Sequence, residues 1–146
     1  MTIPDPDTPP IRLLVDADAC PVREECVKVA LRHGVRVTFV SNSFFRIETD
    51  PLVEREIVPG NFDAADDRIV EHVTRRAVVV TADILLAERC IKAEAAAVMN
   101  HTGKPFTPDS IGMAVATRAI MADLRAGGAQ VGGPAPFSRQ DRSRFL

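Results

Sequence analysis

Short apolar segments alternate along this chain with segments of helical periodicity, and this alternation constrains the fold more than any other feature. Apolar, β-branched stretches typical of buried strands lie at 11–15, 35–40, 54–58, 77–81 and 95–99. Apolar residues recur at helical spacing over 21–33, 63–76, 84–93 and 109–126. Strands that alternate with helices form a parallel sheet covered on both faces. The sequence therefore predicts an α/β fold.

Residues typical of helix ends support these limits. Pro21 is expected at the first position of the first helix, and Gly34 just after its last turn, where glycine readily adopts a left-handed conformation. Asp83 is the expected N-cap of the third helix. Ser138 and Asp141 are spaced to begin a short terminal helix.

The length of 146 residues fits one domain. Residues 1–10 hold four of the eleven prolines and are expected to form a disordered leader. The α/β domain is expected over 11–128, with a loop at 100–108. Glycine and proline punctuate residues 129–146, which we expect to form a C-terminal extension packed on the domain.

Composition argues against several classes of protein. Trp and Tyr are absent and Phe occurs seven times, so a platform for stacking single-stranded bases would have to be built from few rings. The cysteines, Cys20, Cys26 and Cys90, lack a CxxC pair, which argues against a disulfide framework and a tetrahedral zinc site. No apolar run approaches the ~20 residues needed to span a bilayer, and the N-terminus lacks signal-peptide features. We expect a cytoplasmic protein with no membrane partner; its oligomeric state stays open, with a homodimer among the options.

The charges are unevenly distributed along the chain. The formal net charge is −2, but residues 1–100 carry 12 basic and 17 acidic side chains, whereas residues 101–146 carry 6 and 3. Arginine outnumbers lysine among the cations by 15 to 3, and its planar group suits bidentate phosphate contacts. The negative charge is therefore concentrated in residues 1–100.

Aspartates lie at three places where the predicted sheet ends or a helix begins. Asp16 and Asp18 follow the first strand, Asp66 and Asp67 lie in the first turn of the second helix, and Asp83 follows the fourth strand. Ligands of open parallel sheets bind outside the carboxyl ends of the strands, where the strand order reverses. If the order is 3-2-1-4-5, Asp16 and Asp83 face each other there.

Carboxylates at such short distances repel one another and raise each other's pKa unless a cation neutralises them. Oxygen ligands from several aspartates suit Mg²⁺ or Mn²⁺, and a metal so held can activate water for phosphodiester hydrolysis. Taken singly, Asp83 is better explained as a helix cap, and Asp63 with Asp66 as an acidic first turn; the aspartates taken together favour a metal site. Neighbours on a helix diverge by ~100°, so only one of Asp66 and Asp67 is expected to face the metal. Polar residues near strand ends are candidate substrate contacts: Ser41, Asn42, Arg46, Arg68 and Thr81.

Four ordered motifs closely resemble those of the YaiI/YqxD family of bacterial proteins: VDADACPV (15–22), AADDRIV (64–70), VTADILLA (80–87) and GGPAPFSRQDRSRF (132–145). The resemblance covers about residues 11–146. That family looks like a branch of the PIN-like nuclease superfamily, which implies a three-layer, Rossmann-like α/β/α sandwich with a central, mainly parallel sheet. It also implies Mg²⁺- or Mn²⁺-dependent cleavage of RNA.

The resemblance assigns roles residue by residue. The aspartate that closes the first strand is Asp16, the middle acidic residue is Asp66 or Asp67, and Asp83 belongs to a TxD element beside Thr81. The candidate catalytic residues are Asp16, Asp18, Asp67 and Asp83, and the candidate metal ligands are Asp16, Asp66, Asp67 and Asp83. The C-terminal motif has no PIN-like counterpart; its arginines contact RNA phosphates, or its phenylalanines pack on the domain.

The favoured hypothesis is a metal-dependent ribonuclease. One alternative is a non-catalytic RNA- or ribosome-associated module of the same fold. Another is a phosphatase of the haloacid-dehalogenase type, because LLVDADAC (13–20) resembles that family's strand end, although Cys20 stands where Thr or Val is usual.

Overall fold

The computed structural model describes residues 10–47, 49–60, 63–126 and 139–146. The strands are β1 (Arg12–Asp16), β2 (Arg36–Ser41), β3 (Val53–Ile57), β4 (Ala77–Val80), β5 (Ala97–Met99) and β6 (Pro105–Phe106). The helices are α1 (Arg23–His33), α2 (Ala64–His72), α3 (Ile84–Lys92), α4 (Pro108–Ala126) and α5 (Arg139–Phe145), and a short 3₁₀ helix spans Ala17–Ala19. The predicted leader lies outside the described residues except for Pro10, as does the start of the predicted C-terminal extension.

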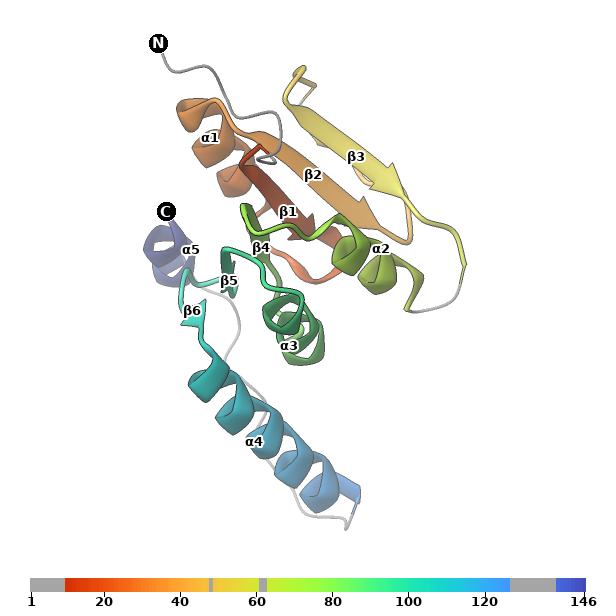
Figure 1. The fold of residues 1–146 in the computed structure, drawn as a ribbon, viewed down its shortest axis with the longest axis vertical. Helices are drawn as coiled ribbons and strands as arrows, with labels where there is room; N and C mark the ends of the chain where they lie inside the picture. Colours follow the sequence, from red (N-terminus) through yellow and green to blue (C-terminus); the bar gives the residue numbers. More distant parts are fainter. Residues whose placement is uncertain (1–9, 48, 61–62, 127–138) are drawn as a thin grey trace.

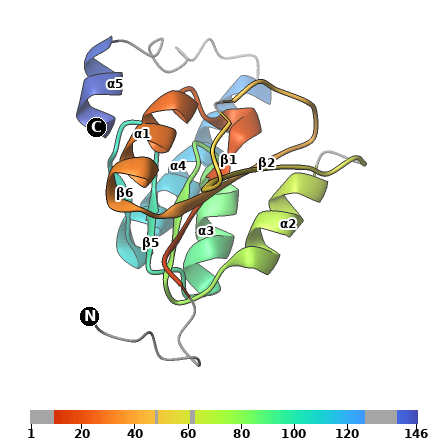
Figure 2. The ribbon, with the colours of Figure 1, turned by 90° about the horizontal axis from the view of Figure 1, so that it is seen from above.

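The strands form one sheet in the order β3-β2-β1-β4-β5-β6, with β6 antiparallel to β5 and every other neighbouring pair parallel. Figure 1 shows the parallel arrows, and Figure 2 shows α1 on one side of the strands with α2 and α3 on the other. The predicted α/β class and three-layer arrangement are therefore confirmed. The observed strand order includes 3-2-1-4-5, the order that places Asp16 and Asp83 at the same point of the sheet.

Two apolar clusters hold the layers together, one on each face of the sheet. Leu14 of β1 packs with Ile69 of α2 and Leu86 of α3. The next residue, Val15, belongs to the opposite cluster with Val27 of α1 and Phe39 of β2. Side chains alternate between the faces of a strand, so a strand buried on both faces reads as a continuous apolar run.

Three local predictions differ from the structure. α1 begins at Arg23, two residues after the proline expected at its first position. α2 ends at His72 rather than at 76, because Val73 is extended and Thr74 forms a turn: its hydroxyl accepts the Arg76 N–H (3.3 Å) and its carbonyl accepts the Ala77 N–H (3.1 Å). The segment 100–108 was expected to be a loop, but it contains β6, which a turn returns alongside β5.

The described part of the C-terminal extension packs on the face that carries α1. Phe145 contacts the apolar cluster on that face. Arg142 donates to the carbonyl of Pro21 (2.8 Å) and to the carboxylate of Glu25 (3.0 Å), whose side chain is only 9% exposed. No helix among the described residues is long and apolar enough to cross a membrane.

Replacement of Arg142 by alanine is expected to destabilise the protein by about 1–2 kcal/mol, because the buried Glu25 carboxylate loses its charged partner. The 42% exposure of Arg142 keeps the cost below that of a fully buried pair. Urea unfolding of both proteins measures the difference. Arg75→Ala is the control, since Arg75 and Glu94 are exposed and 3.9 Å apart, and it should change little. Equal stability of Arg142→Ala and the native protein would show that α5 is not anchored through Glu25.

Candidate functional site

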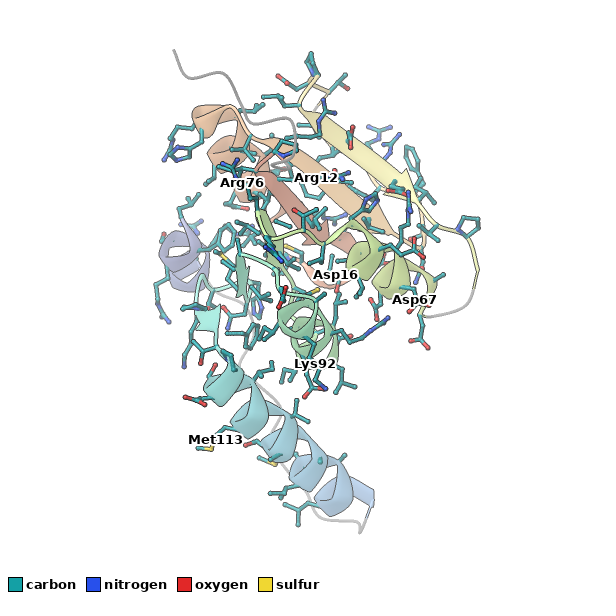
Figure 3. The ribbon with its side chains drawn as sticks, viewed as in Figure 1. Arg12, Asp16, Asp67, Arg76, Lys92 and Met113 are labelled. Atoms are coloured by element: carbon teal, nitrogen blue, oxygen red, sulfur yellow. The ribbon has the colours of Figure 1, made fainter. Side chains whose placement is uncertain are left out.

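Two of the predicted aspartates, Asp16 and Asp83, lie where the strand order reverses. β1 and β4 are parallel neighbours, with Val15 opposite Val80, so both chains leave the sheet at the same edge. From β1 the chain continues to β2 on one side, and from β4 to β5 on the other. Asp16 is the last residue of β1, and Asp83 is the N-cap of α3. Figure 3 shows Asp16 at this carboxyl edge and Arg12 and Arg76 toward the opposite edge.

A hydrogen-bonded chain through Thr81 links the two aspartates. The buried Thr81 hydroxyl donates to Oδ2 of Asp16 (2.9 Å) and accepts the backbone N–H of Asp83 (2.9 Å). A threonine fits this place because its hydroxyl can donate and accept at once. Thr81, predicted to contact substrate, therefore lies where it orients Asp16.

Asp83 caps α3, as its sequence context predicted. Its Oδ1 accepts the N–H groups of Leu85 (2.9 Å) and Leu86 (3.3 Å). Its Oδ2 accepts no hydrogen bond from the described residues. Capping thus uses one carboxylate oxygen and leaves the other for a ligand.

The neighbouring aspartates of α2 point in different directions. Asp67 pairs with Arg89 of α3 (2.9 Å), and Figure 3 shows it toward the outer end of α2. Asp66 has no ion pair with a described residue, and its pKa is raised by burial and then by the charges of Asp83 and Asp63. Asp66 therefore interacts electrostatically with Asp16 and Asp83, whereas Asp67 is held by Arg89. Arg89 was not anticipated, because a contact between two helices leaves no local signal in the sequence.

Asp16 is the most strongly perturbed carboxylate of the site. Its side chain is 3% exposed, and burial raises its pKa to about 6 against the opposing hydrogen bond from Thr81. The charges of Asp66, Asp83 and Asp18 raise the pKa further. Among the described residues, no Lys, Arg or His forms an ion pair with Asp16. A bound cation would relieve this repulsion.

Asp18 lies at the border of this site. Its carboxylate accepts hydrogen bonds from the Ser41 hydroxyl (2.5 Å) and the backbone N–H of Asn42 (2.8 Å). Its negative charge raises the pKa of Asp16. Ser41 is buried, its Oγ accepts the Ser43 N–H (3.1 Å), and the same Oγ lies 2.7 Å from the Ser43 carbonyl oxygen. Ser41 and Asn42 were predicted to contact substrate, and in the structure their hydrogen bonds hold Asp18 in position.

The two arginines predicted to contact substrate differ in their surroundings. Arg68 is engaged by Glu56 of β3 and by Glu71 of its own helix (2.9 Å). Arg46 is exposed and has no hydrogen bond or ion pair with the described residues. Of the two, Arg46 is the one available to a phosphate.

The donor chemistry of the aspartates fits a divalent cation. In the described part of the chain, no three His, Cys, Asp or Glu side chains stand together as a complete metal-ligand group. Mg²⁺ does not require such a group, because it keeps several waters and is commonly held by one or two carboxylates with substrate phosphate. Asp16, whose pKa is raised by the charges of Asp66 and Asp83, provides a hard oxygen donor of that kind.

The fold and these residues define an open, mainly parallel α/β protein with a carboxylate cluster at its topological switch point. A family model described as "Uncharacterized BCR, YaiI/YqxD family" matches residues 14–146, and the chain belongs to that family.

Curated relatives match along most of the chain. A UPF0178 protein of Sphingopyxis alaskensis is 62% identical over 135 residues, which cover 92% of this chain and 87% of the relative. Another, from a Bradyrhizobium species, is 51% identical over 140 residues, 96% of this chain and 85% of the relative. The comparison with solved structures found no match.

Proposed function

We propose that this protein is a metal-dependent nuclease that hydrolyses RNA phosphodiesters, with Asp16, Asp66 and Asp83 holding Mg²⁺ or Mn²⁺. The observation that carries the proposal is the state of Asp16: a buried carboxylate at the switch point, with other carboxylates around it and no cationic partner among the described residues. Burying uncompensated charge is costly, and such groups cluster at functional sites.

Each residue of the site has a distinct task in this proposal. Thr81 fixes the direction of the Asp16 carboxylate, and Asp83 both caps α3 and presents its second oxygen to the site. Asp18, held by Ser41 and Asn42, extends the negative charge toward the turn after β2. A bound Mg²⁺ or Mn²⁺ would neutralise these carboxylates, activate water and stabilise charge on the phosphate.

The choice of RNA as substrate rests on the resemblance of the strand-end aspartates to those of PIN-like nucleases. The arginine-rich composition is consistent with a phosphate-bearing partner. The site is therefore expected to cleave single-stranded RNA in the presence of Mg²⁺ or Mn²⁺ and not in EDTA.

The neighbouring aspartates of α2 provide a sharp test. Asp66→Asn is expected to lower metal-dependent RNA cleavage by about 10-fold or more, because it removes a carboxylate whose charge interacts with those of Asp16 and Asp83. Asp67→Asn is the matched control: it changes the adjacent residue by the same atoms and breaks only the exposed Arg89 pair. Initial rates of cleavage of a labelled single-stranded RNA measure both.

Equal rates for Asp66→Asn and the native protein would contradict this assignment. RNA binding without cleavage under any metal condition would favour a non-catalytic module. Phosphate release from small monoesters with a trapped aspartyl-phosphate at Asp16 would favour the phosphatase hypothesis.

A further inference from the structure

A hollow at the start of α1 is not used by the proposed chemistry. It has a volume of about 430 Å³, and its lining includes Arg23, Glu24, Arg46 and Arg142. A second hollow of about 350 Å³ shares Glu24 and Arg46 with it and adds Lys28. Volumes of this size are typical of sites for small ligands.

The charge of these hollows is opposite to that of the whole protein. Their charged residues are four cations and two carboxylates: Arg23, Lys28, Arg46, Arg142, Glu24 and Glu25. Glu25 is already paired with Arg142, which leaves Glu24 as the remaining acid. In a chain of formal net charge −2, this is a local excess of positive charge. An anion is therefore the kind of ligand that the hollows favour.

The loop that contributes Arg46 to this cationic hollow also carries an exposed aromatic ring. Phe44 is 66% exposed, although it is large and apolar, and the Arg55 guanidinium lies 4.3 Å from the centre of its ring. The next residue, Phe45, turns inward against Phe39 (5.9 Å between ring centres), and Arg23 lies 4.9 Å from its ring centre. Phe45 thus anchors the loop to the core, while Phe44 remains available on the surface.

The loop that carries these groups begins at the aspartate site. Asn42 donates its backbone N–H to Asp18, and Phe44 and Arg46 follow within a few residues. On the other wall of the hollow, α1 begins at Arg23, soon after Asp18 in the chain. A ligand that extends from Asp16 past Asp18 would meet the start of this loop, which Asp18 holds through Ser41 and Asn42.

We propose that the loop 42–47 and the first turn of α1 form a subsite for single-stranded nucleic acid, in which Phe44 stacks on one unpaired base and Arg46 and Arg23 bind the adjoining backbone phosphates. This subsite deepens the proposed function and rests on it for the identity of the ligand as RNA. Stacking requires a base whose face is free, so the subsite selects single strands over duplexes.

Binding in EDTA tests the subsite apart from cleavage. The probe is a short fluorescent 2′-O-methyl oligouridylate, measured by fluorescence anisotropy with the full chain. Phe44→Ala is expected to raise Kd roughly 5- to 100-fold without changing its salt dependence, because one base–aromatic stack is lost. Arg46→Ala is expected to raise Kd and to reduce the slope of log K against log salt by about 0.7, because one phosphate contact is lost.

Arg75→Ala is the control, because it removes an exposed cation next to Arg76, which Figure 3 shows toward the opposite edge of the sheet. It should leave Kd unchanged, and a duplex of the same sequence should bind more weakly than the single strand. Unchanged binding by both Phe44→Ala and Arg46→Ala, or equal losses in Arg75→Ala, would overturn the subsite.

Cleavage by the native protein separates the two proposals. If it cleaves RNA in Mg²⁺ or Mn²⁺ while Phe44→Ala and Arg46→Ala bind normally, the subsite is wrong and the nuclease assignment stands. If the native protein does not cleave RNA, but Phe44→Ala and Arg46→Ala both bind it more weakly, the subsite stands and the nuclease assignment fails.

Discussion

Replacement of Asp16 by asparagine is expected to abolish metal-dependent RNA cleavage while leaving the protein folded. Asparagine keeps the size of aspartate, and its carbonyl oxygen can still accept the Thr81 hydroxyl that now bonds Oδ2 at 2.9 Å. What is lost is the negative charge at the centre of the aspartate cluster. Metal stabilisation of transition-state charge contributes several kcal/mol, so cleavage should fall by about 100-fold or more.

Two further variants make this expectation specific. Asp83→Asn should also lose cleavage but retain α3, because asparagine is as good an N-cap as aspartate. Asp67→Asn should keep most of the activity, since Asp67 faces Arg89 and not the cluster. Native rates in both Asp16→Asn and Asp83→Asn would remove the aspartate cluster from the mechanism.

The same Asp16→Asn change is expected to stabilise the metal-free protein at neutral pH. The pKa of Asp16 is about 6 in the folded protein and about 3.8 without the fold, mainly because the carboxylate is buried. The folded state therefore holds an extra proton between these values, and stability decreases as the pH rises from about 4 to about 6. Above that range, the ionised Asp16 costs the native protein about 2–3 kcal/mol that asparagine does not.

Urea unfolding in EDTA at pH 4, 5, 6 and 7 measures this effect as the difference between the native protein and Asp16→Asn. Other titrating groups are common to both proteins and cancel in the difference. The advantage of the variant should grow with pH and level off near neutrality, and Mg²⁺ should stabilise only the native protein. A difference that stays flat from pH 4 to pH 7 would show that Asp16 is not destabilised by its surroundings.

The alternation of strands and helices was enough to predict the fold class, because short apolar runs and segments of helical periodicity follow one another along most of the chain. β6 could not be predicted in this way: it has two residues, and its pairing with β5 depends on a turn built around Asn100. The end of α2 was overestimated by about one turn, since apolar periodicity alone does not register the turn formed by Thr74.

For the site, the sequence indicated which edge of the sheet collects aspartates but not which of them face one another. Asp66 and Asp67 are indistinguishable in sequence, and Arg89 of another helix separates them. The sequence around Arg68 does not reveal its pairing with Glu56, because Glu56 lies on another element, β3. Phe44 was not anticipated, because its exposure and its contact with Arg55 depend on how the loop folds.

The central claim, that the aspartates at the switch point bind a divalent cation, is tested most directly by a crystal grown or soaked with Mn²⁺. The account predicts an anomalous difference peak bounded by Asp16, Asp66 and Asp83, and its loss in a crystal of Asp16→Asn. A well-ordered site with no peak there, or a peak that persists in the variant, would contradict the account.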